Sequence, residues 1–240
     1  RPGECEAICQ DLLKRNPDEV NAMRLLAKVA MAAGRWRRAE NVLYKALQVA
    51  PAFDDARLEL ARVLKEQDRV EEAVDRTSEV VERSPRHAPA WYLHASMLAI
   101  VGRYEDALTA YERAIELRAY NPPAYIGMGH LLKTLGRQAE GIAAYRTAIE
   151  QRPDFAEVYW SLANLKTFRF TPEEVRVMET YVADDQLNED ARVHFLFTLG
   201  KACEDQREFE RSFDYYQQAC EMQRMRIAYD PVETQLLHER

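Results

Sequence analysis

Cysteines are the first residues of this chain that could bind a metal or act as nucleophiles. The four cysteines are Cys5, Cys9, Cys203 and Cys220. No pair has the CxxC spacing, and no cysteine stands near histidines at zinc-ligand spacing. Cys5 and Cys9 would share one face of a helix, but further ligands are missing. We therefore expect reduced, mostly buried thiols, no metal site, and a cytoplasmic protein.

Carboxylate pairs and histidines could support acid–base catalysis. Two acidic pairs occur, at Asp184-Asp185 and Glu204-Asp205. A two-carboxylate mechanism needs a facing acid at a fixed distance, and the sequence places none. His130 could be a general base or a pH-sensitive contact, but we favour a polar residue of a binding surface. His94 is expected to be a satisfied core histidine. We therefore expect no enzyme and no cofactor within this chain.

The overall composition excludes several classes of protein. Of the 240 residues, 47% are hydrophobic and 30% are charged, with only 8 Gly and 10 Pro, which excludes collagen-like and disordered chains. The net charge of −7 argues against a general nucleic-acid binder. No apolar run approaches the ~20 residues that span a membrane. The chain begins Arg1-Pro2-Gly3-Glu4, with no initiator Met or signal segment, so we expect a fragment of a longer protein.

Small residues and prolines recur every 34 residues, which predicts a helical repeat. One position holds Ala27, Ala61, Ala95, Gly129 and Ala163; another holds Gly34, Asp68, Gly102 and Gly136; a third holds Pro17, Pro51 and Pro85. The glycine would end the first helix of each unit with a positive φ. The small residues would allow helices to cross closely, and the proline would stop the second helix. Each unit is therefore expected to be a helical hairpin.

This pattern resembles the tetratricopeptide repeat (TPR) family. The matching residues of the third unit are Trp91, Ala95, Leu98, Gly102, Tyr104, Ala107, Tyr111 and Ala114. The resemblance implies an all-α fold, a right-handed superhelical solenoid of about five hairpins over residues 20–165, followed by irregular C-terminal helices. We place the units at 20–53, 54–87, 88–121 and 122–155, with a fifth starting at 156. Residues 1–19 are expected to be the truncated helix of a leading repeat.

The repeat is expected to break at Lys166 and to give way to an irregular helical region, 166–240. Thr171, Pro172 and Glu174 form the pattern of a capping box and predict a helix start. Asn188 is expected to cap a further helix. A TPR-like hairpin is expected over 193–226, and a last helix near Val232.

A more specific resemblance covers roughly residues 120–240, and two segments carry most of it. They are SLANLKTFRF at 161–170 and HFLFTLGKACED at 194–205. They resemble bacterial proteins that join TPRs to a sulfotransferase domain. The resemblance implies the non-catalytic N-terminal part of such a protein, leading to a missing catalytic domain. That domain would bind the phosphosulfate donor PAPS through a phosphate loop, and this chain contains no such motif. The alternative is a stand-alone interaction or assembly module.

The first helix of each hairpin would line a concave groove. The expected groove residues are Arg24, Lys28, Arg62, Lys65, Tyr92, Ile126, His130, Lys133, Trp160 and Asn164. Basic and aromatic side chains there suit an acidic extended peptide of a partner protein. An ordinary solvated helix face is the alternative. Glu59 stands where a chaperone-type clamp has Asn and would repel a terminal carboxylate, so a chaperone adaptor is not expected. Self-association through the hydrophobic end of the stack is a third option.

Overall fold

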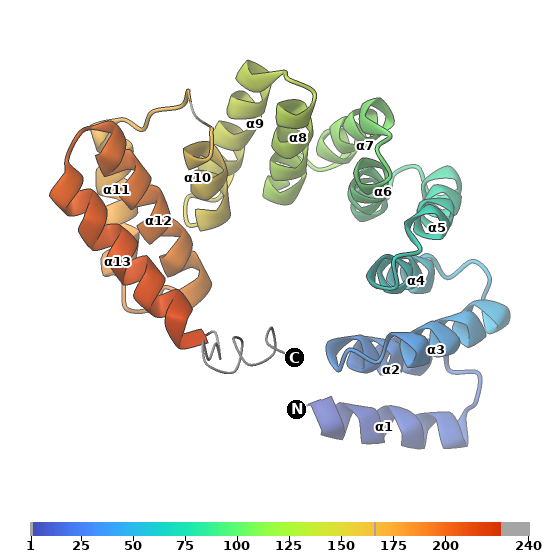
Figure 1. Cartoon of the computed structure of the whole chain (residues 1–240). Coiled ribbons are helices and arrows are strands. Elements are labelled where there is room, and N and C mark those ends of the chain that lie inside the picture. The colour runs from blue at the N-terminus through green and yellow to red at the C-terminus, as the bar shows by residue number, and fades with distance from the viewer. Residues whose placement is uncertain (1, 166, 227–240) are drawn as a thin grey trace, which may run out of the picture. The chain divides into compact units, whose positions relative to one another are not determined.

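The computed structural model describes residues 2–165 and 167–226, and every regular element in these ranges is an α-helix (Figure 1). The predicted all-α fold is therefore confirmed for the described residues. The helices are α1 (Pro2–Arg15), α2 (Val20–Ala32), α3 (Trp36–Val49), α4 (Asp54–Glu66), α5 (Val70–Arg83), α6 (Ala88–Ile100), α7 (Tyr104–Leu117), α8 (Pro122–Thr134), α9 (Gln138–Gln151), α10 (Ala156–Ala163), α11 (Pro172–Ala183), α12 (Glu189–Asp205) and α13 (Phe209–Arg226). The predicted break at Lys166 and the helix expected near Val232 lie outside the described residues.

The 34-residue spacing of the sequence appears directly in the helix starts. The helices α2, α4, α6 and α8 each span 13 residues and begin at 20, 54, 88 and 122. The helices α3, α5, α7 and α9 each span 14 residues and begin at 36, 70, 104 and 138. Within the first three pairs, each helix packs against its successor. The pattern of small and apolar residues therefore produces hairpins, as a helical period requires.

The turn inside each hairpin has one conformation, although its sequence varies. Gly34, Gly102 and Gly136 have φ values of +67°, +80° and +75°, and Asp68 in the same position has +61°. The next residue then donates its N–H to the carbonyl five residues earlier, as in the 2.8 Å bond from Arg35 to Ala30. This left-handed residue and its hydrogen bond end the first helix. The predicted turn position is confirmed, and Asp68 adopts it without being glycine.

Close helix packing explains the small residues. Ala27, Ala61 and Ala95 are fully buried at one repeat position, where neighbouring helices cross. Gly127 has a different role, because a Cβ there would lie 2.4 Å from the Tyr111 ring. The missing side chain therefore makes room for a tyrosine of the preceding hairpin.

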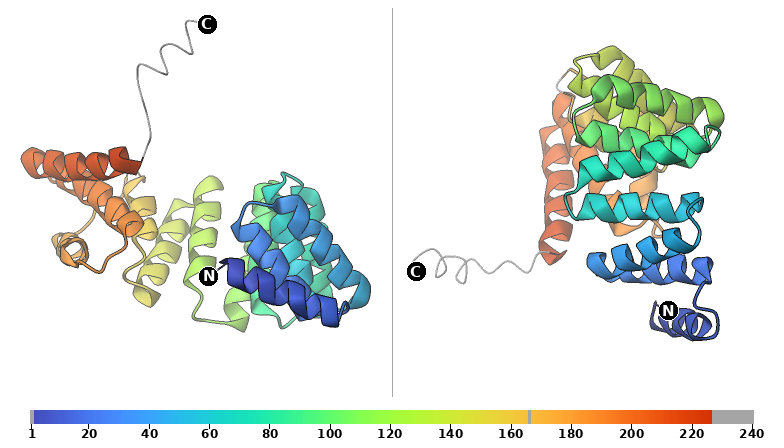
Figure 2. Two further views of the ribbon diagram at one scale, coloured as in Figure 1. Left: turned by 90° about the horizontal axis from the view of Figure 1, so that it is seen from below. Right: turned by 90° about the vertical axis from the view of Figure 1, so that its right-hand side faces the viewer.

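The chain divides into two compact units, the first ending at Gly141 and the second beginning at Ile142, both within α9. In the first unit, α2, α4, α6 and α8 contact one another in succession. Figure 1 shows these first helices on the inner side of a curved stack, with α3, α5 and α7 outside. In both views of Figure 2, α1 (dark blue) lies at one edge of this stack beside α2. The first unit therefore has an inner face built mainly by alternate helices.

The second unit packs around aromatic rings instead of small residues. The Phe195 ring lies 5.2 Å from Tyr159 and 5.3 Å from Tyr181, centroid to centroid. The Phe168 and Phe170 rings, from the segment after α10, are 4.9 Å apart. The helix α12 packs against α10, α11 and α13. The shortened α10, with eight residues, is therefore followed by a segment that buries its own side chains in this core.

The predicted starts of α11 and α12 are confirmed. The Thr171 hydroxyl accepts a hydrogen bond from the Glu174 N–H at 3.2 Å, and the Glu174 carboxylate accepts one from the Thr171 N–H at 2.8 Å. The Asn188 side chain accepts a 2.9 Å bond from the Ala191 N–H. These caps satisfy amide groups that have no partner inside the helix.

Candidate functional site

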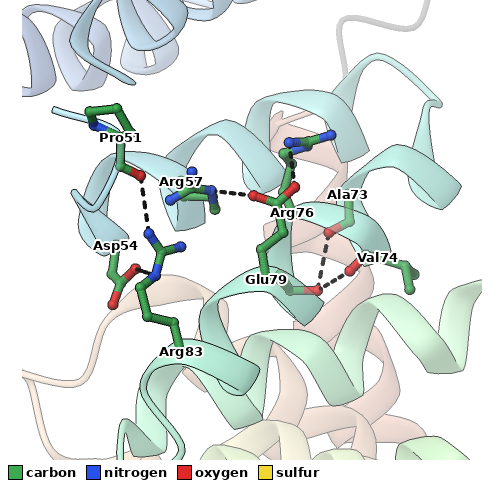
Figure 3. Close-up of polar contacts among 9 residues, drawn as sticks. Pro51, Asp54, Arg57, Ala73, Val74, Arg76, Glu79 and Arg83 are labelled. Atoms are coloured by element: carbon green, nitrogen blue, oxygen red, sulfur yellow. Dashed lines mark hydrogen bonds and ion pairs between the residues drawn. The ribbon is translucent and has the colours of Figure 1, made fainter. Parts of the chain in front are cut away.

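The second hairpin contains an arginine where other repeats have a large apolar residue. This position holds Met23, Arg57, Trp91, Tyr125 and Tyr159. The Arg57 side chain is buried, and its Nε lies 2.7 Å from Glu79 Oε2. Arg76 pairs with the same carboxylate at 2.5 Å, as a dashed line in Figure 3 marks. The pairing joins the two helices of one hairpin, so we assign it to stability and not to chemistry.

The ends of this hairpin are also joined by polar contacts. Arg83 donates to the Pro51 carbonyl at 3.0 Å and pairs with Asp54 at 3.2 Å (Figure 3). The Ser84 hydroxyl donates to the Asp54 carboxylate at 2.6 Å. The loop before α4 is thereby tied to the end of α5, which fixes the orientation of α4 at the inner face.

Two of the predicted groove residues are already paired with acids of the next repeat. Arg24 Nη1 lies 3.4 Å from Asp55 Oδ2, and Lys28 Nζ lies 4.0 Å from Glu59 Oε1. Both pairs run from α2 to α4. An incoming carboxylate would have to replace these acids, so the basic character expected at this end of the groove is largely neutralised.

Three predicted residues, Arg62, Lys65 and Tyr92, come together at a pocket between the inner helices. This pocket, which we name the inner pocket, has a volume of about 390 Å³. It is lined by Met31, Ala32, Trp36, Arg62, Lys65, Glu66, Tyr92, Leu93, Ser96, Met97 and Ile100. Lys65 pairs with Glu66 at 3.2 Å, whereas Arg62 is exposed and makes no ion pair with any residue that the structure describes. The inner pocket is therefore largely apolar, with the Arg62 cation at its edge.

The wall of the inner pocket formed by Tyr92 is held from behind. The Tyr92 and Tyr111 ring centroids are 6.1 Å apart. The Tyr111 and Ser96 hydroxyls lie 3.2 Å apart, within hydrogen-bonding distance. Burial raises the pKa of Tyr111, and the contact with Ser96 acts in the opposite direction. Tyr111 therefore stays protonated at neutral pH and supports Tyr92, in the space that Gly127 leaves.

The remaining groove predictions for the first unit have different outcomes. Ile126 is 6% exposed, so little of its side chain is accessible to a ligand, and its place in the groove stays a prediction. Leu58, at the same repeat position, is also buried, whereas Tyr92 at this position lines the inner pocket. His130 is half-buried, and Lys133 is exposed without an ion pair in the described ranges. Neither residue lines the inner pocket.

Trp160 and Asn164 belong to the second unit, where each has neighbours from that unit. The Trp160 ring lies 5.5 Å from Phe197, which in turn lies 6.3 Å from Tyr216. The Asn164 amide donates to the Trp160 carbonyl at 2.9 Å. Trp160 is half-buried in an aromatic row, and Asn164 is exposed at the end of α10.

Sequence reasoning missed Trp36 and Ile100, two residues that shape the inner pocket. Ile100 is 52% exposed at the end of α6, at a repeat position that holds Glu66 and Thr134 in neighbouring units. An isoleucine at a polar position was the available signal. Trp36 is half-buried at the start of α3, where the equivalent position of the second repeat holds Val70. The much larger side chain of Trp36, compared with this valine, was the corresponding signal in the sequence.

The cysteines and acidic residues do not gather into a metal site among the described residues, where no cluster of three or more possible ligands occurs. All four cysteines are free thiols; Cys9 and Cys203 are buried, Cys5 is half-buried and Cys220 is exposed. Burial raises the pKa of the Cys9 thiol, and the neighbouring Cys5 raises it further. Low thiolate content makes Cys9 a poor nucleophile. Among the described helices, none has the length and apolar character that crossing a bilayer requires.

Comparison with known proteins places the repeats in a family. A tetratricopeptide repeat model matches residues 30–97, a TPR repeat model matches 96–136 and 129–166, and a further tetratricopeptide repeat model matches 193–224. A search of curated protein sequences finds no match. The last match falls on α12 and α13, the TPR-like hairpin.

Solved structures with the same fold include MamA and YrrB. The MamA RS-1 ArsTM double mutant aligns with a TM-score of 0.57 and 17% identity, over 63% of this chain and 85% of that one. YrrB, described as a TPR protein with an unusual peptide-binding site, aligns with a TM-score of 0.55 and 17% identity, over 87% of this chain and 97% of that one. MamA 41-end from Desulfovibrio magneticus RS-1 aligns with a TM-score of 0.55 and 14% identity, over 87% of this chain and 97% of that one. At these identities the likeness shows the fold alone. Residues 30–166 and 193–224 are tetratricopeptide repeats, and the chain is a tetratricopeptide-repeat protein.

Proposed function

We propose that this chain is a scaffold that binds an extended segment of a partner protein on the inner face of its first unit. The observation that carries the proposal is the inner pocket, about 390 Å³ between α2, α4 and α6. A volume of this size accepts one large side chain of a bound segment. The rest of the segment would lie along the inner helices.

The lining of the inner pocket supports this function. Ile100 is 52% exposed at the edge of the inner pocket, although burial of an isoleucine side chain is energetically favourable. Tyr92 offers a flat ring with a polar end, the kind of residue that dominates binding energy at interfaces. The inner face of a TPR solenoid is also the surface that its curvature makes available to an extended ligand. YrrB, of the same fold, is titled as having a peptide-binding site.

Peptide selection tests the proposal even though the partner is unidentified. Peptides from a random displayed library would be selected on the purified chain, and their affinity measured by fluorescence anisotropy. Ile100→Ser should weaken the selected peptides by about tenfold, because it removes an apolar contact at the pocket. Val49→Ser on the outer helix α3 is the matched control, since Val49 is 44% exposed and does not line the pocket. Equal affinity of both variants would show that the pocket is not the binding site.

The association with a sulfotransferase domain is a second, finer proposal, which rests on the sequence resemblance alone. If it holds, the partner segment is an acceptor or a docking partner for a PAPS-dependent domain that lies outside this chain. The natural gene sequence beyond Arg240 tests it. A strand, a phosphate loop and a helix would support it, whereas a stop codon or an unrelated sequence would leave the stand-alone module. Bacterial origin and cytoplasmic localisation likewise stay predictions.

A further inference from the structure

We infer that the partner segment is acidic and that it continues from the inner pocket, over Trp36, onto a second surface at the start of α3. This inference rests on the proposed function and adds the chemistry and the path of the ligand. The second surface, which we name the arginine pocket, has a volume of about 620 Å³. It is lined by Gly34, Arg35, Trp36, Arg37, Arg38 and Gln67.

Trp36 connects the two surfaces, because its side chain lines both pockets. A half-buried indole offers a flat apolar surface on which a peptide can pass between them. The path starts between Tyr92 and Ile100, crosses Trp36 and ends at Arg37. All of these residues belong to the first unit.

The arginine pocket carries more positive charge than its neighbours neutralise. Arg38 lies 2.7 Å from Glu6 Oε1, and Arg35 lies 3.8 Å from Oε2 of the same carboxylate. Arg37 is exposed and has no ion-pair partner in the part of the chain that the structure describes. Within that part, Arg35 and Arg38 thus share one acid and Arg37 has none. Together with the unpaired Arg62, they form a cationic track on a chain whose net charge is −7.

The other repeats show that this charge is specific to the first hairpin. There the second helix begins with acids, at Glu71 and Glu72, at Glu105 and Asp106, and at Glu140. In each case the arginine before the helix pairs with the acid three residues on: Arg69 with Glu72 at 2.6 Å, Arg103 with Asp106 at 2.7 Å, and Arg137 with Glu140 at 2.6 Å. In the first hairpin, Arg37 and Arg38 replace these acids. The pairing within the helix start is lost; Arg35 and Arg38 pair with Glu6 instead, and the Arg37 guanidinium remains available to a carboxylate of a ligand.

The combination of surfaces defines the ligand. An apolar or aromatic side chain fits the inner pocket, and Asp or Glu residues on one side of it meet Arg62 and then Arg37. A nucleic acid fits less well, because Glu66 lines the inner pocket on the path and would repel a phosphate backbone. An acidic peptide can instead place its carboxylates only at the arginines.

Single charge reversals test the path. Arg37→Glu and Arg62→Glu change exposed arginines that make no ion pair with described residues, so neither should disturb folding. Arg86→Glu is the matched control, because Arg86 is also exposed and without an ion pair in the described ranges, and it lines neither pocket. Peptides selected on the wild-type chain should be enriched in Asp and Glu next to an aromatic or aliphatic residue. Each of the two pocket variants should weaken them roughly three- to tenfold at low salt, and the control less than about twofold.

The outcomes separate this inference from the proposed function. If Ile100→Ser weakens the selected peptides but Arg37→Glu matches Arg86→Glu, the path is wrong and the inner pocket still binds peptide. Neutral or basic selected sequences would overturn the acidic ligand in the same way. If polyphosphate displaces the peptides from the wild type and from Ile100→Ser equally well, the surface binds any polyanion and the inference fails. If no peptide is selected, both proposals fail.

Discussion

The Arg57 guanidinium lies 2.7 Å from the Glu79 carboxylate, at a repeat position that holds Met23 and Trp91 in the neighbouring hairpins. Arg57 is 9% exposed, so the contact places a charge in what is otherwise an apolar layer. Removing one partner of such a pair leaves an unmatched buried charge, whereas replacing the buried member with an apolar residue removes the desolvation cost.

We therefore expect opposite effects from changes to the two partners. Glu79→Ala should destabilise the protein by about 1–2 kcal/mol, less than for a fully buried pair because Glu79 is 39% exposed. Arg57→Met, which copies the first repeat, should be neutral or stabilising. The double variant should resemble Arg57→Met. Urea unfolding measures all three, and a Glu79→Ala midpoint equal to that of the wild type would refute the interpretation.

Gly127 is predicted to be intolerant of any side chain. In Gly127→Ala the new Cβ would lie 2.4 Å from the Tyr111 ring, which must then move away from Ser96 and Tyr92. Such overpacking costs about 1–3 kcal/mol, and it should also weaken peptide binding at the inner pocket. Gly3→Ala is the control, because a Cβ at Gly3 meets nothing within 4 Å. Melting curves followed by circular dichroism give the comparison, and indistinguishable curves would show that Tyr111 has other room.

Substitutions at equivalent positions of two hairpin turns are expected to change the stability in opposite directions. Gly136 has φ +75°, so Gly136→Val should destabilise the fold by ~1 kcal/mol or more through strain in the left-handed region. Asp68 has φ +61°, and Asp68→Gly should relieve part of such strain and stabilise by roughly 0.5 kcal/mol. Chemical denaturation resolves both shifts. Destabilisation by Asp68→Gly would mean that the aspartate side chain contributes more than the strain costs.

His94 is expected to make stability depend on pH. Its pKa lies below the ordinary histidine value of about 6.5, mainly because burial disfavours the imidazolium, with Arg103 acting in the same direction and Asp106 and Glu82 against it. The unfolded chain therefore takes up the proton more readily, and stability should fall as the pH drops below about 6.5. His94→Leu, which copies the equivalent Leu60, should reduce this slope. Urea midpoints at about pH 7.5 and 5.5 measure it.

Thr77 makes this test interpretable. Its hydroxyl lies 2.9 Å from His94 Nδ1 and also 2.9 Å from the Val74 carbonyl. In His94→Leu the hydroxyl keeps its backbone partner, so no buried polar group is left unpaired. An identical pH slope in the variant and the wild type would assign the effect to other groups.

Self-association stays a prediction, and α1 offers the surface for it. Ile8 is 62% exposed and Leu12 is 46% exposed, four residues apart on the same helix. If copies associate through this face, the mass measured by light scattering should rise with concentration, and Ile8→Ser with Leu12→Ser should abolish the rise. A constant monomer mass would exclude it.

The helices could be predicted from the sequence because their signals are local. The turn position shared by Gly34 and Asp68 and the cap at Thr171 depend on neighbours within a few residues, and the 34-residue period repeats such local signals from one hairpin to the next. The half-buried place of His94 follows from the same periodicity. Such patterns specify helix faces and ends independently of the tertiary contacts.

The binding surface could be predicted only in part, because it depends on distances between repeats. The repeat register predicts Arg62, Lys65 and Tyr92 at the inner face, where the structure brings them to one pocket, but the pairing of Arg24 with Asp55 needs the spacing of α2 and α4. The same register assigns Ile126 to the groove, but it does not predict that this side chain is only 6% exposed.

The pairs Arg24–Asp55 and Lys28–Glu59 have a consequence for how a ligand would distribute its affinity. A ligand carboxylate that binds Arg24 or Lys28 replaces an anion of the protein itself. Its net contribution to the binding free energy is therefore small, and its dissociation is fast. A carboxylate that meets Arg62 or Arg37 displaces only water. The binding surface therefore differs in selectivity along its length. Where the cations are already ion-paired, it should accept many ligand sequences, and where they are unpaired, it should favour ligands with a carboxylate at that place.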